Sequence, residues 1–446
     1  MSLFRAAAVV VALVAAVVAT ACGGATTPAP RPNIVLVTVD TLRADHMDAY
    51  GYDRGTAPVF ARLAGAGVRF EHALSQAPWT LPSMASVHTS LYPSQHGAVT
   101  AETALPEAAE TLAERLGALG YSTVAVVSHE FITAEHGFAQ GFDVFDESNV
   151  VGHEAVTSTD LTRTALARLG GVSEPFFLWV HYFDPHFAYV RHPRFGFADG
   201  YEGGLPDQLT AGRLTQVERR SVDAADLAYI NAVYDEEIAH TDEWVGKLWD
   251  GLETRYGEGN NVLIFTADHG EYFLERGRFF HGKDVYDSLV RVPLLIAGAI
   301  DEELRGRVVA QTVEIRSIPK TVLGMLGAPA DGFGGVDLLD VARGGDNEPS
   351  FAEGSYAFGI DQRKRAVVRD GWKLIHRLDD DDYELYELAS DPHERNDRYG
   401  AEMDGAVVAR LKELLAEFVD LPRLQPQPVG LSPAEIERLR ALGYIR

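Results

Sequence analysis

The chain has 446 residues, of which 46% are hydrophobic, and a formal net charge of −26. This length and apolar content allow a large buried core and indicate one large α/β domain with an appendage. The negative charge excludes nucleic acid and anionic membrane surfaces as partners, because both would repel the protein. An anionic substrate would therefore need local positive charge or a metal ion.

The N-terminus is predicted to be a targeting segment. Arg5 precedes Ala6–Ala19, an apolar run that is short for a membrane span and typical of a secretory signal. The small residues before Cys22 indicate a bacterial lipoprotein signal, so we expect residues 1–21 to be removed and Cys22 to carry a lipid in the cell envelope, in the periplasm or on the outer surface. Ordinary secretion is the alternative. Residues 22–31 would be a tether, and the lipid would be the only membrane contact.

Several apolar, β-rich runs alternate with helical stretches, which is typical of a mostly parallel sheet with helices on both faces. These runs are residues 33–39, 122–127, 176–182, 262–266 and 292–297. Residues 227–252 carry apolar side chains at nearly helical spacing, which predicts a long covering helix whose acidic face is solvated. Residues 199–226 look like an insertion near the mouth of a site, where insertions usually set substrate choice.

Two of these runs end in potential metal ligands. Asp40 follows the first strand, and Asp268 and His269 follow the strand that ends at Ala267. Carboxylates and an imidazole at the carboxyl edge of a parallel sheet can hold a metal ion. The sequence therefore predicts one site assembled from distant segments. Cys22 is the only cysteine, so this site has no thiol nucleophile.

Residues 77–86 predict a further part of the site. Thr80, followed by Pro82, indicates the N-cap and first turn of a short helix. The free N–H groups and the dipole of this helix would favour an anion and lower the cost of a Thr80 alkoxide. A metal at the same place would complete the activation. A purely structural cap is the alternative for this segment taken alone.

With these segments in place, the chain resembles the sulfatase branch of the alkaline phosphatase superfamily. The resemblance spans most of residues 32–398 and is carried, in the family's order, by residues 32–40, 80–97, 181–186, 266–271, 281–293 and 372–396. It implies an alkaline-phosphatase-like α/β fold with a catalytic domain over residues 32–345. Residues 346–446 would form a small C-terminal α+β subdomain with an antiparallel sheet and terminal helices, the last of them amphipathic over residues 431–446.

The resemblance also implies roles for individual residues. Four positions match the ligands of one divalent metal: Asp40, Thr80, Asp268 and His269. Thr80 also matches the nucleophile, and His186 and Lys283 match residues that contact the transferred anion or the leaving group. His281 could protonate the leaving group. For His186 and His281, a hydrogen bond to the backbone is the alternative role.

The ligand set leaves the metal open. Oxygen ligands suit calcium, magnesium or manganese, whereas the imidazole favours manganese or zinc. A second metal would need another cluster, for which Asp184, His186 and His281 are the candidates.

Several positions depart from the family pattern. Sulfatases carry a Cys or Ser that becomes formylglycine, in a motif that ends in Arg, whereas this chain has Thr80 and Met84. A secondary alcohol cannot become an aldehyde by that route, so no formylglycine is expected. Thr41 replaces the second Asp of the family's Asp-Asp pair, and Leu91 stands where a basic residue is common. Arg43 could restore positive charge and bind substrate, or it could be an ordinary salt-bridge residue.

The expected function is metal-dependent hydrolysis of sulfate or phosphate esters through Thr80. The superfamily includes phosphodiesterases and phospho-group transferases that use a Thr nucleophile, and sulfate release without the aldehyde would be slow, so phosphoesters are favoured. The substrate would be a small-molecule, glycan or lipid ester. Two other classes stay open: a phospho-group transferase, and a non-catalytic surface binding protein with a decayed site.

Overall fold

A computed structural model describes residues 31–151, 156–219, 222–354, 362–403, 405–430 and 436–437. The predictions for the signal segment, for lipidation of Cys22 and for most of the helix at residues 431–446 fall outside the described residues. Pro32–Arg446 forms one compact unit. None of the described helices combines the length and the apolar character that a membrane span requires.

The described part of this unit is built on a nine-stranded sheet with the order β13-β2-β12-β9-β1-β6-β4-β5, in which β14 also pairs with β2. The strands are β1 (Asn33–Val39), β2 (Val68–Leu74), β4 (Ser122–Val127), β5 (Val144–Asp146), β6 (Phe176–Tyr182), β9 (Asn261–Ala267), β12 (Arg291–Gly298), β13 (Arg307–Val309) and β14 (Val313–Glu314). β12 runs antiparallel to both of its neighbours, whereas the other pairs are parallel. The prediction of a mostly parallel sheet is confirmed.

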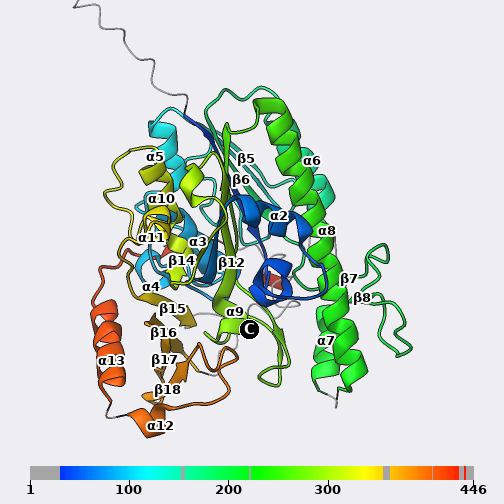
Figure 1. The fold of residues 1–446 in the computed structure, drawn as a ribbon, viewed down its shortest axis with the longest axis vertical. Coiled ribbons are helices and arrows are strands. Elements are labelled where there is room, and N and C mark those ends of the chain that lie inside the picture. The colour runs from blue at the N-terminus through cyan, green and yellow to red at the C-terminus, as the bar shows by residue number, and fades with distance from the viewer. Residues whose placement is uncertain are drawn as a thin grey trace, which may run out of the picture. The chain divides into compact units, whose positions relative to one another are not determined.

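Helices cover both faces of this sheet (Figure 1). One face carries α2 (Pro58–Ala66), α6 (Ser158–Arg168) and the long α8 (Ala224–Tyr256), which contacts both of the others. The other carries α3 (Thr80–Thr89), α5 (Leu112–Ala118) and α10 (Ile318–Met325). Strands β1, β6 and β9 are buried along their whole length, as a sheet covered on both sides requires.

The prediction of a solvated acidic face on residues 227–252 is wrong. Four acids of α8 are at most 7% exposed: Asp235, Glu236, Glu237 and Asp242. Glu236, Glu237 and Asp242 accept backbone N–H groups that the neighbouring segments would otherwise bury without partners, for example Val190 N on Glu237 and His192 N on Glu236, each at 2.7 Å. Asp235 instead binds the side chains of His46, Tyr52 and Arg54. The segment that begins with β7 (Tyr189–Val190), just before the predicted insertion, therefore packs on this acidic face. The predicted insertion itself contains β8 (Gln208–Leu209), which pairs with β7, and α7 (Ala211–Glu218).

A second, antiparallel sheet has the order β15-β16-β17-β18. Its strands are β15 (Ser350–Gly354), β16 (Lys364–Arg369), β17 (Trp372–Arg377) and β18 (Asp382–Glu387), and α13 (Ala406–Val419) packs against it. Buried Lys373 of β17 contacts Asp287 Oδ1 and Glu394 Oε1, each at 2.7 Å. Asp287 begins α9 (Asp287–Val290), so this sheet is tied to the segment that follows Lys283.

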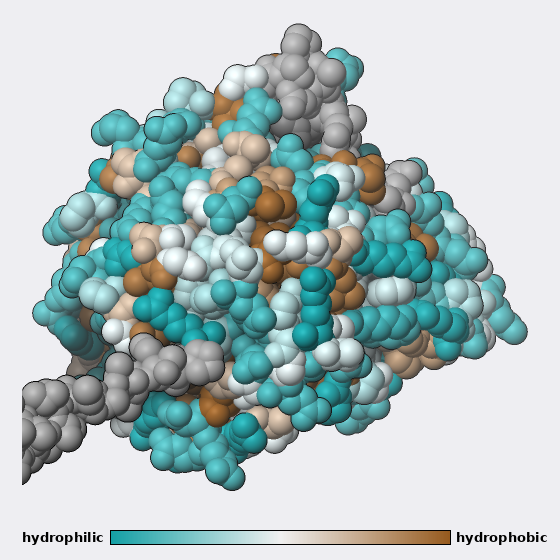
Figure 2. Space-filling view, turned by 90° about the horizontal axis from the view of Figure 1, so that it is seen from above, coloured by the Kyte–Doolittle hydropathy of each residue, from teal (hydrophilic) through white to brown (hydrophobic). Residues whose placement is uncertain are grey.

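The remaining described elements are short. They are α4 (Pro93–His96), α11 (Leu338–Ala342), α12 (Tyr399–Glu402), the strands β3 (Thr103–Ala104), β10 (Tyr272–Phe273), β11 (Phe279–Phe280) and β19 (Gln427–Pro428), and the 3-10 helices η1 (Ala44–His46), η2 (Asp48–Tyr50), η3 (Glu302–Leu304) and η4 (Ile315–Ser317). Seen from above, the surface is mostly hydrophilic, and hydrophobic residues form small patches between the polar ones (Figure 2).

Candidate active site

Four predicted site residues meet at the carboxyl edge of the central strands. Asp40 follows β1, Asp268 and His269 follow the adjacent β9, and Thr80 begins α3. Thr80 Oγ1 lies 3.3 Å from His269 Nε2, which is 3.3 Å from Asp268 Oδ2 and 3.8 Å from Asp40 Oδ1. All four residues are at most 2% exposed. The structure therefore brings the segments around residues 40, 80 and 268 into one buried cluster.

Thr80 is the first residue of α3, and its N-cap is Trp79, so the predicted cap position is one residue too late. The hydroxyl of Thr80 still lies at the end of the helix where free N–H groups favour an anion. Ser83 donates a hydrogen bond from Oγ to Asp268 O at 2.6 Å, which pins the first turn of α3 to the end of β9. Met84 is fully buried, so an apolar side chain occupies this position of α3.

The carboxylates of this cluster are only partly compensated, since Thr41 N and His269 N donate to Oδ1 of Asp268 but not to its Oδ2. Burial raises the pKa of Asp40 well above its usual value, and the charges of Asp268 and Glu271 raise it further. Burial also raises the pKa of Asp268. Among the described residues, both oxygens of Asp40 and Oδ2 of Asp268 are without a hydrogen-bond partner. Because such buried carboxylates are costly, the cluster fits a cation.

The spacing within the cluster also fits a metal ion. Two ligands that bind one ion at about 2.1 Å lie roughly 3.0–3.4 Å apart. The distances of 3.3 Å from Thr80 Oγ1 and from Asp268 Oδ2 to His269 Nε2 match that separation. His269 Nδ1–H donates to Gly270 O at 2.8 Å, which leaves the lone pair of Nε2 directed toward the carboxylates. Asp40, Thr80, Asp268 and His269 could thus hold one divalent cation.

Two further histidines lie beside Asp40, and the sequence reasoning assigned neither to the site. Nε2 of His129 and Nε2 of His181 are each 3.5 Å from Asp40 Oδ2. His129 lies just after β4, and His181 is the second-last residue of β6. The signal that identified Asp40, a polar side chain at the carboxyl end of a predicted strand, would have found both.

The bonds at Nδ1 distinguish His129 from a metal ligand. Phe131 N donates to His129 Nδ1 at 3.0 Å, so a neutral His129 carries its hydrogen on Nε2. His129 is therefore a hydrogen-bond donor toward Asp40 or toward an oxygen of a bound anion. Asp40, His129 and His186 offer atoms close enough for one ion, but the hydrogen on Nε2 of His129 opposes that arrangement.

His186 and His281 both lie at this cluster. The ring centroid of His281 is 4.3 Å from that of His269 and 5.1 Å from that of His186. His186 Nδ1–H donates to Phe187 O at 2.7 Å, the backbone bond named as the alternative, and its Nε2 is thereby left with a lone pair. His281 Nδ1–H donates to Glu271 Oε1 at 3.1 Å.

Glu271 also belongs to the site, although sequence reasoning assigned it no role beyond its place in the segment of residues 266–271. Its Oε1 accepts from His281, and its Oε2 accepts from Tyr189 OH at 3.0 Å. Burial raises the pKa of Glu271 to about 8, and the neighbouring His269 and Tyr189 lower it. The carboxyl group fixes the tautomer and the orientation of His281, so that Nε2 of His281 faces the cluster.

The predicted second metal cluster of Asp184, His186 and His281 is corrected by the structure. Both oxygens of Asp184 are occupied, because Ser158 N and Ser158 Oγ donate to Oδ2 at 2.8 and 2.6 Å and Thr157 N donates to Oδ1 at 3.2 Å. Asp184 thus binds the first residues of α6, and its short Asp-Pro-His spacing does not turn it toward His281.

The role of Arg43 in substrate binding is also corrected. Its Nε and Nη2 donate to Asp45 at 2.9 and 2.7 Å, and its Nη1 donates to Glu271 O at 2.9 Å and to Glu275. Arg43 is therefore a buried salt-bridge residue, the alternative that its sequence position left open.

Lys283 differs from Arg43, because it is half-buried and forms no hydrogen bond or ion pair with the described residues. No contact places its amine against Thr80.

Thr41, which stands at the family's second Asp, has a left-handed backbone with φ of 50°. A β-branched residue is rare there, and the conformation costs roughly 1–3 kcal/mol. It is held because Thr41 N donates to Asp268 Oδ1 at 3.1 Å and Thr41 O accepts from Tyr234 OH at 2.7 Å. Thr41 thus positions the Asp268 carboxylate through its backbone.

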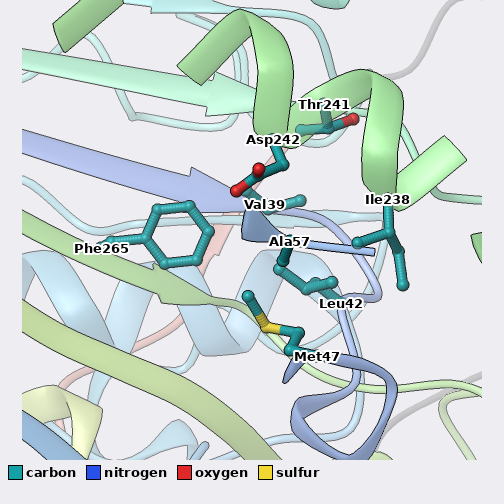
Figure 3. A pocket seen from close by; sticks show the side chains of 8 residues that line it. All are labelled: Val39, Leu42, Met47, Ala57, Ile238, Thr241, Asp242 and Phe265. Carbon is teal, nitrogen blue, oxygen red and sulfur yellow. The ribbon is translucent and has the colours of Figure 1, made fainter. Parts of the chain in front are cut away.

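A small apolar pocket lies behind the site and does not belong to it. Figure 3 shows its lining of Val39, Leu42, Met47, Ala57, Ile238, Thr241, Asp242 and Phe265. The Asp242 carboxylate accepts Val59 N and Phe60 N at 2.8 and 2.9 Å, so it holds the start of α2. The pocket is therefore a packing gap between α8 and the sheet.

Comparison with known proteins adds independent findings. A family model described as sulfatase matches residues 32–328, and one described as the C-terminal part of N-sulphoglucosamine sulphohydrolase matches residues 275–420. An arylsulfatase of Clostridium perfringens is 23% identical over 464 residues, which cover 87% of this chain and 95% of the relative. A Δ4,5-hexuronate-2-O-sulfatase of Bacteroides thetaiotaomicron is 23% identical over 448 residues, 89% of this chain and 91% of the relative.

A solved structure is similar in fold as well. The phosphonate monoester hydrolase of Agrobacterium radiobacter superimposes with a TM-score of 0.67 at 20% sequence identity, over 87% of this chain and 95% of that chain. At this identity the likeness concerns the fold, and it agrees with the α/β architecture described above.

Proposed function

Because the chain belongs to the sulfatase family and is a hydrolase acting on ester bonds, we propose that it cleaves phosphate or sulfate esters with Thr80 as the nucleophile. The proposal includes one divalent metal, bound by Asp40, Thr80, Asp268 and His269. The observation that supports it most is the position of Thr80 Oγ1, 3.3 Å from His269 Nε2 in a buried cluster of unpaired carboxylate oxygens. No thiol is available among residues 31–446 to replace this hydroxyl.

A bound cation would supply positive charge that stabilises the Thr80 alkoxide and the oxygens of the transferred group. Thr80, having released its proton to solvent, attacks phosphorus or sulfur, and the bond to the leaving oxygen breaks as the bond to Oγ1 forms. His281, protonated at Nε2, gives that proton to the departing alcohol. In the second half, His281 takes a proton from water, the resulting hydroxide attacks the same centre, and Thr80 leaves as an alkoxide.

The remaining side chains would bind the anion. Lys283 is a cation without an ionic partner among the described residues, and the N-terminus of α3 offers free N–H groups. His129, with its hydrogen on Nε2, adds a neutral donor near Asp40. With Met84 at the position where the family carries an Arg, these groups would bind the anion without that guanidinium.

Phosphoesters are the favoured substrates. A threonine cannot form formylglycine, so a sulfo-threonine would have to break its S–O bond without the second hydroxyl that expels sulfate. A phospho-threonine is attacked by water at phosphorus, with the same geometry as the first step. The fold is compatible with this chemistry, because the similar structure from Agrobacterium radiobacter is described as a phosphonate monoester hydrolase.

The test is a substrate screen with variants of Thr80. The purified protein is incubated with aryl sulfate, phosphate monoester and phosphodiester substrates in calcium, magnesium, manganese or zinc. Thr80→Ala should lose roughly 10³-fold or more in kcat, and Thr80→Ser should retain part of the activity. Thr89→Ala is the matched control, because Thr89 is a buried threonine of the same helix that donates to Ala85 O.

Acid quench and mass spectrometry should find the phospho-group on Thr80. Full activity of Thr80→Ala would refute the nucleophile. Absence of turnover with every metal and ester would favour the binding protein, and transfer to added alcohols in preference to water would favour the transferase.

We also propose that the protein is exported and anchored by a lipid on Cys22. The support is the apolar run Ala6–Ala19 before Cys22. Labelling of cells with a radioactive fatty acid should mark the wild type, and Cys22→Ser should abolish the label. An unlabelled wild type in the culture medium would support ordinary secretion instead.

A further inference from the structure

We propose that His181 is an additional ligand of the site's metal, in the coordination position that the family gives to the second Asp and that Thr41 cannot fill. This inference rests on the metal site of the proposed function. It assigns the site two imidazoles, two carboxylates and one hydroxyl, a donor set for zinc or manganese rather than calcium.

The position of His181 supports coordination. Its side chain is fully buried, and its Nε2 has no hydrogen-bond partner among the described residues. One ligand atom each from Asp40, His181 and Asp268 lies within 4.8 Å of the others. The 3.5 Å from His181 Nε2 to Asp40 Oδ2 is long for a hydrogen bond and close to the separation of two ligands on one ion.

The strand pairing explains why the imidazole points to the metal site. β1 and β6 are parallel neighbours, with Thr38 opposite His181. Side chains two residues apart on a strand share a face, so Thr38 and Asp40 lie on the same side of β1. His181 therefore lies against Thr38 and extends toward the carboxylate of Asp40.

The partner of the other ring nitrogen completes the argument. His181 Nδ1 is 2.8 Å from Thr38 Oγ1, which also accepts Trp179 Nε1–H at 2.9 Å. A hydroxyl can accept Nδ1–H, and the lone pair of Nε2 is then free to bind a cation, the arrangement common to metal-binding histidines. His129 has the same distance to Asp40 but faces a backbone N–H that can only donate. His181 and His129 thus differ in the hydrogen bond at Nδ1, which decides whether Nε2 can bind a metal, and not in their distance to Asp40.

Thr41 does not replace the missing aspartate. Its backbone N–H is committed to Asp268, and its Oγ1 is buried without a hydrogen-bond partner among the described residues. A neutral hydroxyl is a weaker ligand than a carboxylate, whereas a neutral imidazole binds borderline metals well. Replacing an oxygen anion by a nitrogen ligand lowers the affinity for calcium in particular.

The direct test counts nitrogen ligands. The full-length protein, with manganese bound and its histidines labelled with nitrogen-15, is studied by pulsed EPR. We expect two directly coordinated imidazole nitrogens in the wild type, one from His181 and one from His269. A single coordinated nitrogen would overturn the inference, and this result needs no variant that could misfold.

Affinity measurements provide the second arm. His181→Gln should weaken zinc binding by about 100-fold or more, which exceeds the usual effect of an outer-sphere residue, and should change calcium binding by less than about 10-fold. His88→Phe is the matched control, because His88 is a buried histidine of α3 whose ring contacts Trp179. Thr38→Val should weaken zinc binding by about 10-fold.

The outcomes separate this inference from the proposed function. Zinc affinity of His181→Gln within about threefold of the wild type would overturn it. An ester hydrolase with one coordinated nitrogen would keep the proposed function and remove His181 from the ligands. Two coordinated nitrogens in a protein without turnover would keep His181 as a ligand and remove the proposed function.

Discussion

Lys373 is the strongest test of how the small sheet supports the site. Its side chain is 0% exposed, and its Nζ lies 2.7 Å from Asp287 Oδ1 and 2.7 Å from Glu394 Oε1. In Lys373→Met the buried Glu394 loses its cation and Asp287 keeps only His72, 2.6 Å from its Oδ2, a change that costs about 3–5 kcal/mol. Because Asp287 begins α9, four residues after Lys283, we expect the same change to lower ester turnover.

The assay is guanidinium unfolding followed by tryptophan fluorescence, at a fixed concentration of the metal. Lys247→Met is the control, because Lys247 is exposed and its ion pair with Glu243 is worth less than about 1 kcal/mol. Adding Asp287→Asn and Glu394→Gln to Lys373→Met should recover most of the lost stability, since no unpaired charge then remains buried. A loss below about 1 kcal/mol, or a combined variant less stable than Lys373→Met, would refute the reasoning.

Further outcomes follow from the site and the core. Burial lowers the pKa of His88 to about 3, so only the unfolded chain takes up a proton at this residue as the pH falls below 6.5. Acidification from pH 7.5 to 5 should therefore lower the free energy of unfolding by about 2 kcal/mol through His88. Unfolding curves of His88→Phe should lack this part of the pH dependence. Glu271→Gln should lower kcat roughly 10-fold for esters of poorly leaving alcohols and less for nitrophenyl esters, because Glu271 orients His281; equal effects on both would contradict that role. Chelation should remove about 2.7 kcal/mol of stability relative to metal at 100 times its Kd, and an unchanged melting temperature would exclude the metal site.

The metal-binding positions at the strand ends could be predicted because the apolar run and the polar residue that ends it are adjacent in sequence. A buried apolar run that ends in Asp40, and another that ends in Asp268, indicate the same edge of a parallel sheet without any knowledge of the partners. β2 was not predicted, because Glu71 and His72 interrupt its apolar pattern and its pairing with the antiparallel β12 depends on distant residues. The strand at residues 292–297 was found, but its direction could not be read from its composition.

The errors concern contacts between distant segments. The sequence left the role of Arg43 open between substrate binding and a salt bridge, because two of its partners, Glu271 O and Glu275, are 228 and 232 residues away in sequence. The acids of α8 looked solvated because the backbone groups that they bind are distant in sequence: Glu236 and Glu237 bind His192 N and Val190 N, and Asp242 binds the start of α2. His181 and His129 were within reach of the rule that identified Asp40, and applying it to every predicted strand end would have named them.

The charge of the site leads to a preference between phosphoesters. The site carries three negative charges, on Asp40, Asp268 and the Thr80 alkoxide, and a divalent cation supplies two positive charges. Arg43 is engaged with Asp45 and Glu271 O, so Lys283 is the one further cation that the described site leaves without an ionic partner. A monoanionic diester is therefore held better than a dianionic monoester, whose second pKa is about 6. At pH 8 we expect kcat/KM for methyl nitrophenyl phosphate to exceed that for nitrophenyl phosphate. At pH 5.5 the monoester becomes a monoanion and the ratio should fall, whereas changes in the enzyme common to both substrates cancel. A monoester preference at pH 8 would show that the site holds more positive charge than these residues supply.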